Sequence, residues 1–265
     1  MQINSFVMLP GAFTAKRVLK WVIFKSCRPK LQHRLRRMYS LYQIMHNTYS
    51  REPEMALIGS LVQPGDYVAD IGANVGVYTR ELSLAVGQKG KVYSFEPLRE
   101  NYDILAALLR KARLDNVFSY RAAVGSRETQ CEMLIPEMSG FTGFYWAHLA
   151  SPGDKGGREM VDVLMIDELF KHRAIDHLDF IKCDVEGGEL EVLRGAINLV
   201  HSHRPGWLME VSRETSEEIF RLFHELGYQA FVYSGQLIPV DAYRDREFSN
   251  YFFLHPQSRN QNRRQ

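Results

Sequence analysis

Three carboxylates stand within six residues of one another, at Asp184, Glu186 and Glu189. They directly follow residues 178–183, a mostly apolar run of strand length, so all three would crowd the carboxyl end of a buried strand. Negative charges at such short range raise one another's pKa values and cost free energy when ionised. Such crowding is expected mainly where the carboxylates serve a function. The chemistry that they offer is proton transfer with a bound substrate or the binding of a hard cation such as Mg²⁺.

A fourth acid, Glu210, lies near the carboxyl end of the next predicted strand, 206–211. Asp184, Glu186 and Glu210 would converge at the ends of these strands, and they are our candidate catalytic residues. A divalent metal site and a metal-free general base are competing accounts. We favour the metal-free account because no further Asp or Asn stands beside Glu210 to complete a compact site. The alternative for Glu186 and Glu189 is that they are first-turn acids that complement a helix dipole.

A second constellation is Asp-Ile-Gly-Ala-Asn-Val-Gly at residues 70–76, between a short apolar run and a helical pattern that starts at Val75. This order predicts a strand, a glycine-rich turn and a helix. Gly72 supplies the backbone freedom for a sharp reversal, and Gly76 lets the helix approach a ligand closely. Asp70 stands at the carboxyl end of the strand, where open α/β sheets bind ligands.

An acid and a group of small residues extend this predicted ligand site. Glu96 ends the apolar run 91–95, and an acid there can accept hydrogen bonds from both hydroxyls of an adenosine ribose. Ala123, near the end of the predicted strand 117–124, would leave room for an adenine ring. A dinucleotide fingerprint has a glycine where Asn74 stands, so the turn does not suit a pyrophosphate.

The turn Asp-x-Gly-x-Asn-x-Gly resembles motif I of S-adenosylmethionine (SAM) methyltransferases, and its full sequence resembles the FkbM family of these enzymes. The most specific part of this resemblance is Asp-Phe-Ile-Lys-x-Asp-x-Glu-Gly-x-Glu, which starts at Asp179. The resemblance covers residues 54–256 and implies O-methylation of a hydroxyl on a sugar, a glycan or a secondary metabolite, with SAM as the cofactor. The expected cofactor-binding residues are Asp70, Gly72, Ala73, Asn74, Gly76, Glu96, Ala123 and Asp184.

Two rival functions share parts of this pattern. A nucleotide-binding oxidoreductase would have the same first strand and ribose acid, but Asn74 and the acids at 184–189 suit it poorly. A catalytically inactive SAM-binding protein of the same fold would differ only in its acceptor groups. Within the methyltransferase interpretation, Asp70 would bind the ammonium of SAM directly or through water, and Glu54 would either border the cofactor pocket or start a helix.

Alternating strands and helices from Gly65 onward predict an α/β protein with a parallel sheet. The resemblance implies the Rossmann-like fold of class I methyltransferases, with a mostly parallel seven-stranded sheet, helices on both faces and N-terminal helices. Its last hairpin, from strands 228–233 and 250–254, would insert an antiparallel strand. The pattern over residues 126–165 predicts a hairpin insertion. Its aromatic residues form either a wall over the active site or apolar packing beneath the hairpin; they are Phe141, Phe144, Tyr145 and Trp146.

The first fifty residues mix apolar side chains with many Lys and Arg residues, and Pro29 is expected to divide them into two helices. Such a stretch contacts an anionic membrane or an acidic substrate, or it is a capping helix with a solvated basic face. We therefore expect three parts: a basic helical extension (1–50), a SAM-dependent methyltransferase domain (51–256) and a disordered tail (257–265).

Composition limits the functional classes further. The formal net charge of +2 argues against a dedicated nucleic-acid binder. The family resemblance implies a small-molecule or glycan hydroxyl acceptor as the partner. Three widely spaced cysteines form neither a disulfide framework nor a zinc signature. With no run of 18 apolar residues and no signal peptide at the start, a cytoplasmic protein is the expectation. The sequence leaves the oligomeric state open.

Overall fold

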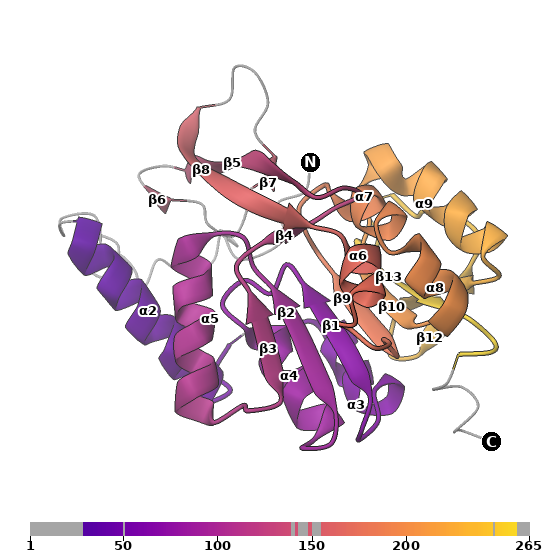
Figure 1. Cartoon of the computed structure of the whole chain (residues 1–265), viewed down its shortest axis with the longest axis horizontal. Coiled ribbons are helices and arrows are strands. Elements are labelled where there is room, and N and C mark those ends of the chain that lie inside the picture. Colours follow the sequence, from indigo (N-terminus) through magenta and orange to yellow (C-terminus); the bar gives the residue numbers. More distant parts are fainter. Residues whose placement is uncertain are drawn as a thin grey trace.

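A main sheet of eight strands is the centre of the computed structural model, which describes residues 29–49, 51–138, 141–142, 148–149, 155–245 and 247–258. Figure 1 shows this sheet with helices packed around it. In spatial order its strands are β12 (Leu237–Val240), β11 (Gln229–Tyr233), β13 (Asn250–Leu254), β10 (Gly206–Glu210), β9 (Phe180–Cys183), β1 (Tyr67–Ile71), β2 (Lys91–Phe95) and β3 (Val117–Tyr120).

The strand directions are those of a class I methyltransferase sheet. Strands β3, β2, β1, β9 and β10 are parallel, and β13 lies antiparallel between β10 and β11. The predicted inserted strand is therefore confirmed. The prediction of seven strands is wrong among the described residues, because β12 adds an eighth at the edge. A Ser-Gly turn at 234–235 folds it back on β11, and Pro239 is tolerated because an edge strand needs fewer ladder bonds.

The two faces of the sheet bury alternate residues of each strand, as the two-residue period of a strand requires. Val68 of β1 packs with α4 (Val77–Val86), together with the short helices η1 (Pro53–Leu57) and α3 (Ile58–Leu61). Ala69, the next residue, faces the other cluster. The helices on that second face are α6 (Ile166–Lys171), α7 (Glu189–Arg194), α8 (Ile197–His203) and α9 (Arg213–Glu225).

Helix α2 (Pro29–Met45) lies beside α5 (Arg99–Ala112) at one edge of the molecule (Figure 1). Leu41 and Ile44 of α2 are buried against Ile104 and Leu108 of α5. Helix α2 begins at Pro29, in agreement with a break at this proline, but the helix expected before it lies outside the described residues, so the predicted division into two helices stays untested. No helix of the described chain is both long and apolar enough to cross a membrane.

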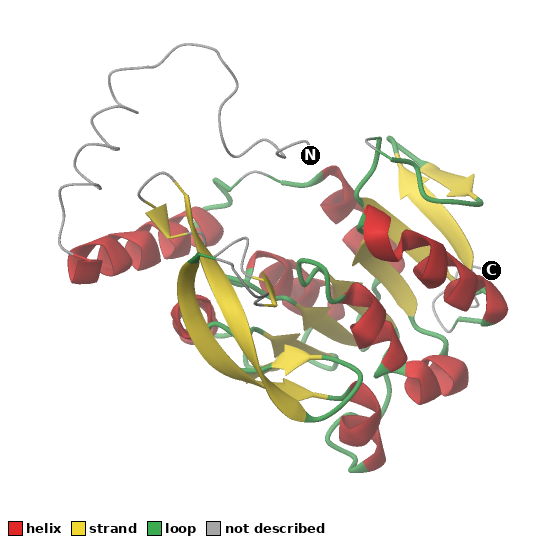
Figure 2. Ribbon diagram, turned by 90° about the horizontal axis from the view of Figure 1, so that it is seen from above, coloured by secondary structure: helices red, strands yellow, loops and turns green. Residues whose placement is uncertain are grey.

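A long β-hairpin forms a second sheet from the predicted insertion. The hairpin consists of β5 (Thr129–Met138) and β8 (Gly156–Leu164). Three short strands complete the sheet: β4 (Ala123–Val124) pairs with β8, and β6 (Phe141–Thr142) and β7 (His148–Leu149) pair with β5. The hairpin rises beyond one end of the main sheet in Figure 1, and in the view from above in Figure 2 its two long strands lie in front of that sheet. The predicted third strand, 117–124, is divided into β3 and β4, because β4 pairs with β8 instead.

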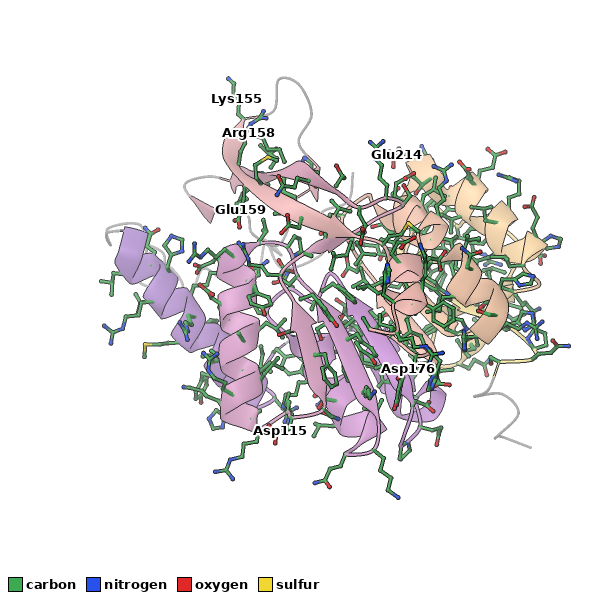
Figure 3. The ribbon with its side chains drawn as sticks, in the orientation of Figure 1. Asp115, Lys155, Arg158, Glu159, Asp176 and Glu214 are labelled. Atoms are coloured by element: carbon green, nitrogen blue, oxygen red, sulfur yellow. The ribbon has the colours of Figure 1, made fainter. Side chains whose placement is uncertain are left out.

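The hairpin is tied to the start of α5. Oε1 of Glu159 accepts a 3.0 Å hydrogen bond from the Arg99 N–H and lies 3.6 Å from the Arg121 guanidinium. In Figure 3, Arg158 and Glu159 lie on the hairpin, while Asp115 lies at the opposite end of the main sheet. The side chains of the predicted aromatic wall lie outside the described part of the chain, so that prediction stays untested.

Candidate active site

The turn after β1 is held in close contact with the turn after β9. Gly72 has φ +78°, and a Cβ at this position would lie 1.8 Å from the carbonyl oxygen of Asp184. The Asp184 N–H in turn donates a 3.0 Å hydrogen bond to the carbonyl of Ile71. Glycine is therefore required at residue 72, since any side chain would force the two turns apart.

Gly76 serves a different purpose from the one expected. It caps α4, which begins at Val77 and not at Val75, and it has φ +93°. A Cβ at Gly76 would lie 2.7 Å from Leu105 and 2.8 Å from Leu108, both on α5. The close approach that Gly76 permits is thus between the turn and a neighbouring helix, and not between the turn and a ligand.

Glu96 is held by three hydrogen bonds at the end of β2. Its Oε2 accepts a 2.9 Å bond from the N–H of Asn74, and its Oε1 accepts bonds from the Leu98 N–H (3.0 Å) and from Nδ2 of Asn101 (3.1 Å). A carboxylate has about four acceptor sites, so Oε2 keeps one for a ligand. Burial raises the pKa of Glu96 to about 7, although the three hydrogen bonds act to lower it.

A cavity of about 370 Å³ joins these turns to the hairpin. Six of the predicted site residues line it: Gly72, Asn74, Glu96, Ala123, Asp184 and Glu186. Four others do not: Asp70, Ala73, Gly76 and Glu210. The hairpin lines it with side chains that the sequence analysis missed, namely Thr129, Cys131, Met133 and Val163. Their signal in the sequence was the strand periodicity of the insertion, with alternate residues on one face.

Asp70 is fully buried and points away from this cavity. Its Oδ2 accepts a 2.6 Å hydrogen bond from the Thr79 hydroxyl, and its Oδ1 lies 3.8 Å from Nζ of Lys182. Burial raises the pKa of Asp70, against the opposing effects of Lys182 and Thr79. Asp70 therefore supports the turn from behind, and it does not reach a ligand in the cavity directly.

Lys182 is the main residue of the site that the sequence analysis missed. Its Nζ donates to the Gly72 carbonyl (3.1 Å) and to Oδ2 of Asp184 (3.3 Å) from within the buried strand β9. Burial alone would lower the pKa of Lys182, but Asp184 and Asp70 raise it above its usual value, so the side chain stays charged. A lysine in an otherwise apolar central strand was the available signal, because buried charges need partners.

The three predicted catalytic carboxylates do converge. Asp184, Glu186 and Glu210 each place an oxygen within 4.8 Å of the others. Burial and the neighbouring Asp184 carboxylate raise the pKa of Glu210 to about 10. Burial acts in the same direction on Asp184, but Lys182 and a hydrogen bond with Glu210 lower its pKa below the usual value. Asp184 and Glu210 therefore share one proton, which lies on Glu210.

Glu186 occupies a strained backbone position at the exposed side of this cluster. Its φ of +56° is in the left-handed region, which non-glycine residues seldom adopt. Desolvation and the carboxylates of Asp184 and Glu189 raise the pKa of Glu186 to about 7. Glu189 is buried and accepts hydrogen bonds from the N–H groups of Gly187 (3.0 Å) and Val185 (3.3 Å), so it shapes the turn that holds Glu186.

Two ligand types suit these groups. Oδ1 of Asn74 is a buried acceptor with no hydrogen-bond partner among the described residues, and it lines the cavity beside the free acceptor site of Glu96. A ligand with hydroxyl and ammonium donors would satisfy both. The oxygens of Asp184, Glu186 and Glu210 match the donor set of Mg²⁺ or Mn²⁺. Lys182, however, already places a positive charge beside Asp184.

Several solved structures that are similar to this chain are methyltransferases, all of low sequence identity to it. A methyltransferase FkbM from Methylobacillus flagellatus KT has a TM-score of 0.49 and 17% identity, over 90% of this chain and 59% of that chain. A SAM-dependent O-methyltransferase from Thermotoga maritima has a TM-score of 0.48 and 16% identity, over 82% and 71%. Fibrillarin from Aeropyrum pernix, with natively bound SAM, has a TM-score of 0.44 and 14% identity, over 75% and 71%.

The family is established by sequence. No curated protein matches this chain. The methyltransferase FkbM domain, however, matches residues 70–230, which is more than half of the 265 residues. The matched segment contains the glycine turn, Glu96, Lys182 and the three converging carboxylates. The resemblance drawn from the motifs is confirmed: this chain belongs to the FkbM methyltransferase family.

Proposed function

We propose that the protein is a SAM-dependent O-methyltransferase that acts on a hydroxyl of a sugar, a glycan or a secondary metabolite. The observation that carries this proposal is a single cavity lined both by Asn74 and Glu96 and by Asp184 and Glu186. The first pair offers acceptors for a nucleoside with hydroxyl and ammonium groups. The second pair offers carboxylates for a reacting hydroxyl. One cavity therefore brings together the groups for both substrates.

The residues at the turn would hold the cofactor. Oε2 of Glu96 would accept a hydrogen bond from a ribose hydroxyl, and Oδ1 of Asn74 would accept a hydrogen bond from a further donor of the cofactor. Ala123 and Val163 provide an apolar surface of the cavity for an adenine ring. Bound SAM supplies an activated methyl group on a sulfonium that leaves readily. The protein's task is then to orient the acceptor and exclude water.

Glu186 is the proposed general base. A sugar hydroxyl has a high pKa, so a neighbouring group must take its proton as the new oxygen–carbon bond forms. A base is most effective when its own pKa lies near the working pH, and the pKa of Glu186 is about 7. Asp184, held ionised by Lys182, would orient the acceptor by accepting a hydrogen bond, and the protonated Glu210 would hold the Asp184 carboxylate in place by donating to it.

Calorimetry with SAM, its demethylated product, NAD and ATP tests the cofactor. SAM and its product should bind, and the other two should not. Glu96→Gln keeps the size of the side chain but replaces an acceptor with a donor, so SAM affinity should fall by about tenfold or more. Asp103→Asn, an exposed change on the nearby helix α5, is the matched control. Saturable NAD binding without SAM binding would end the proposal.

A methyl-transfer assay tests the reaction. With isotopically labelled methyl groups and a panel of sugars, glycans and hydroxylated metabolites, the label should appear on an acceptor oxygen, as mass spectrometry would show. Glu186→Gln should then lower turnover while SAM affinity is largely kept. SAM binding without transfer to any hydroxyl, amine or carbon acceptor would instead favour the inactive SAM-binding protein.

A further inference from the structure

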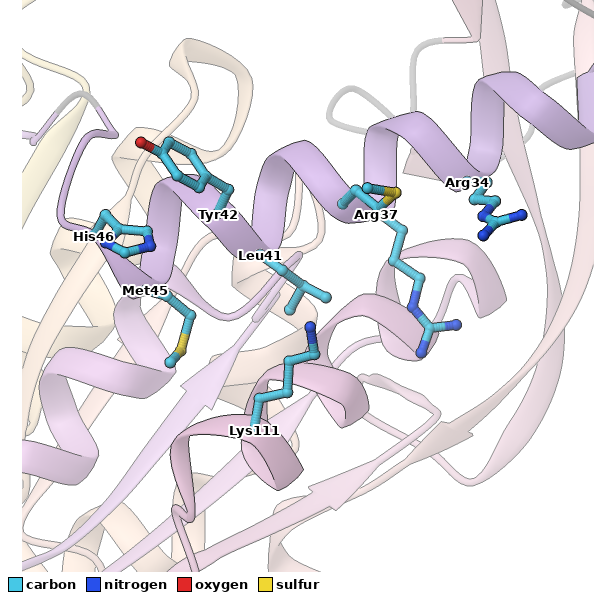
Figure 4. A pocket seen from close by; sticks show the side chains of 8 residues that line it. Arg34, Arg37, Leu41, Tyr42, Met45, His46 and Lys111 are labelled. Carbon is cyan, nitrogen blue, oxygen red and sulfur yellow. The ribbon is translucent and has the colours of Figure 1, made fainter.

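A groove runs along the outer side of helix α2, away from the cofactor cavity. It has a volume of about 790 Å³ and lies between α2 and the end of α5. Figure 4 shows Lys111 of α5 reaching toward Leu41, with Arg37 of α2 beside them and Arg34 further along the helix. We call this feature, lined also by Met38 and Tyr42, the α2 groove.

The α2 groove continues into an apolar surface that nothing in the described chain covers. Leu41 and Ile44 are buried against α5, but Met38 is 59% exposed and Tyr42 is 57% exposed, although both line the groove together with Leu41. The apolar surface of α2 therefore extends beyond the part that is packed against α5. Large apolar side chains gathered on one exposed helix face are typical of an interaction surface.

The N-terminal region, which includes α2, carries a large excess of positive charge. Residues 1–50 contain nine of the 33 Lys and Arg residues and none of the 31 Asp and Glu residues. The rest of the chain therefore has 24 basic and 31 acidic residues, a formal charge of −7. Within the described part of the chain, no carboxylate lies within ion-pair distance of Arg34, Arg37 or Lys111. Such asymmetry between parts of one chain indicates an anionic partner.

The same charges argue against two other occupants. A second copy that docked by its own α2 would bring four Lys and Arg residues against four. The preceding segment, 1–28, carries five Lys and Arg residues and would add positive charge to the groove. Its apolar side chains include Trp21, Ile23 and Phe24, in a run flanked by Lys20 and Lys25, and this mixture of apolar and basic residues is typical of interfacial membrane segments.

We propose that the α2 groove and the exposed face of α2 dock onto the surface of an anionic phospholipid bilayer. Arg34, Arg37 and Lys111 would contact lipid phosphates, while Met38 and Tyr42 would lie at the level of the headgroups. A basic side chain near an anionic surface adds attraction that salt screens, and an apolar side chain adds attraction that salt does not screen. The two contributions are therefore separable by experiment.

Vesicle co-sedimentation of the full-length protein tests this docking surface. Binding should be strong to vesicles of phosphatidylcholine with 30% phosphatidylglycerol and weak to pure phosphatidylcholine. Arg34→Glu, Arg37→Glu and Lys111→Glu together should lower vesicle affinity by about a hundredfold or more. The matched control reverses three exposed lysines elsewhere, Lys89, Lys155 and Lys171. A pair of variants tests the apolar contribution: Met38→Ser should weaken binding at high salt, and Leu84→Ser, at an exposed position of α4, should not.

Three results would overturn the proposal: equal binding to neutral and anionic vesicles, equal loss in the control triple variant, or anionic-vesicle binding no tighter than binding to a single-stranded RNA. SAM affinity in each variant shows that the fold is kept. If the triple variant fails to bind SAM, Arg37→Glu alone with the single control Lys89→Glu replaces it.

Discussion

The guanidinium of Arg36 on α2 donates a 2.6 Å hydrogen bond to Oδ1 of Asn101 on α5. Nδ2 of the same amide donates to Oε1 of Glu96, the acid expected to hold the ribose. Because Arg36 can only donate, it fixes which end of the Asn101 amide faces Glu96. A helix outside the matched family segment thereby orients a group of the cofactor cavity.

Arg36→Met should weaken SAM binding by about fivefold to tenfold, since the Asn101 amide loses the hydrogen bond that holds it against the Glu96 carboxylate. Calorimetry measures the change. Arg34→Met, two residues earlier on α2, is the control, and Glu100→Gln tests the ion pair that Arg36 also makes at 3.5 Å. Unchanged affinity in Arg36→Met, or an equal loss in Glu100→Gln, would show that the amide orientation does not depend on Arg36.

Glu186→Gly should leave the protein as stable as the parent, or up to about 1 kcal/mol more stable, because it relieves a left-handed backbone. Turnover should nevertheless fall by about 10²–10⁴. Thermal unfolding and methyl transfer measure the two effects. Arg173→Gly is the matched control, since Arg173 has the same φ of +56° far from the cavity. Full activity in Glu186→Gly would remove this carboxylate from the chemistry.

The sequence predicted those parts of the site that local order determines. The strand, glycine turn and helix at 67–86, and the acids after β9, follow from residue types and spacing alone. Side-chain direction was harder to predict. Asp70 and Glu96 both stand near strand ends, yet Asp70 is fully buried and only Glu96 lines the cavity.

Long-range partners were the other gap. The role of Lys182 depends on the pairing of β9 with β1, which brings Asp70 and the Gly72 carbonyl close to its Nζ. Likewise, the sequence predicted that Gly76 allows close approach to a ligand, but its neighbours in the structure are Leu105 and Leu108 of α5. The extra edge strand β12 was missed because Pro239 breaks its strand pattern. In each case the deciding contact joins residues far apart in the chain.

Turnover at saturating SAM and acceptor should rise with pH, with an inflection near pH 7, because the base must be ionised to accept a proton. Asp184 raises the pKa of Glu186, so Asp184→Asn should move the inflection to lower pH as well as reduce turnover. Saturation with SAM keeps the titration of Glu96 out of the profile. An inflection that does not move in Asp184→Asn would assign the titration to another group.

Glu210→Gln should stabilise the protein more at pH 8 than at pH 5.5. The pKa of Glu210 is about 10 in the folded state and near 4.5 in the unfolded chain, so folding takes up a proton between these values. The contribution of Glu210 to the free energy of unfolding therefore falls as pH rises through this window. Glutamine does not titrate and removes that loss. A melting-temperature gain that is the same at both pH values would contradict the assignment of the proton to Glu210.

Methyl transfer should survive exhaustive chelation. Nζ of Lys182 lies 3.3 Å from Oδ2 of Asp184, and the proton on Glu210 removes a second negative charge from the cluster. The site is therefore largely neutralised by its own residues, and a divalent ion would have to displace a proton and compete with a fixed ammonium. After dialysis against EDTA, turnover should stay within about twofold of the untreated enzyme, and added Mg²⁺ or Mn²⁺ should not raise it. SAM affinity before and after dialysis is the control for intact folding. Loss of turnover that either ion restores, with SAM binding unchanged, would instead make Asp184, Glu186 and Glu210 a metal site.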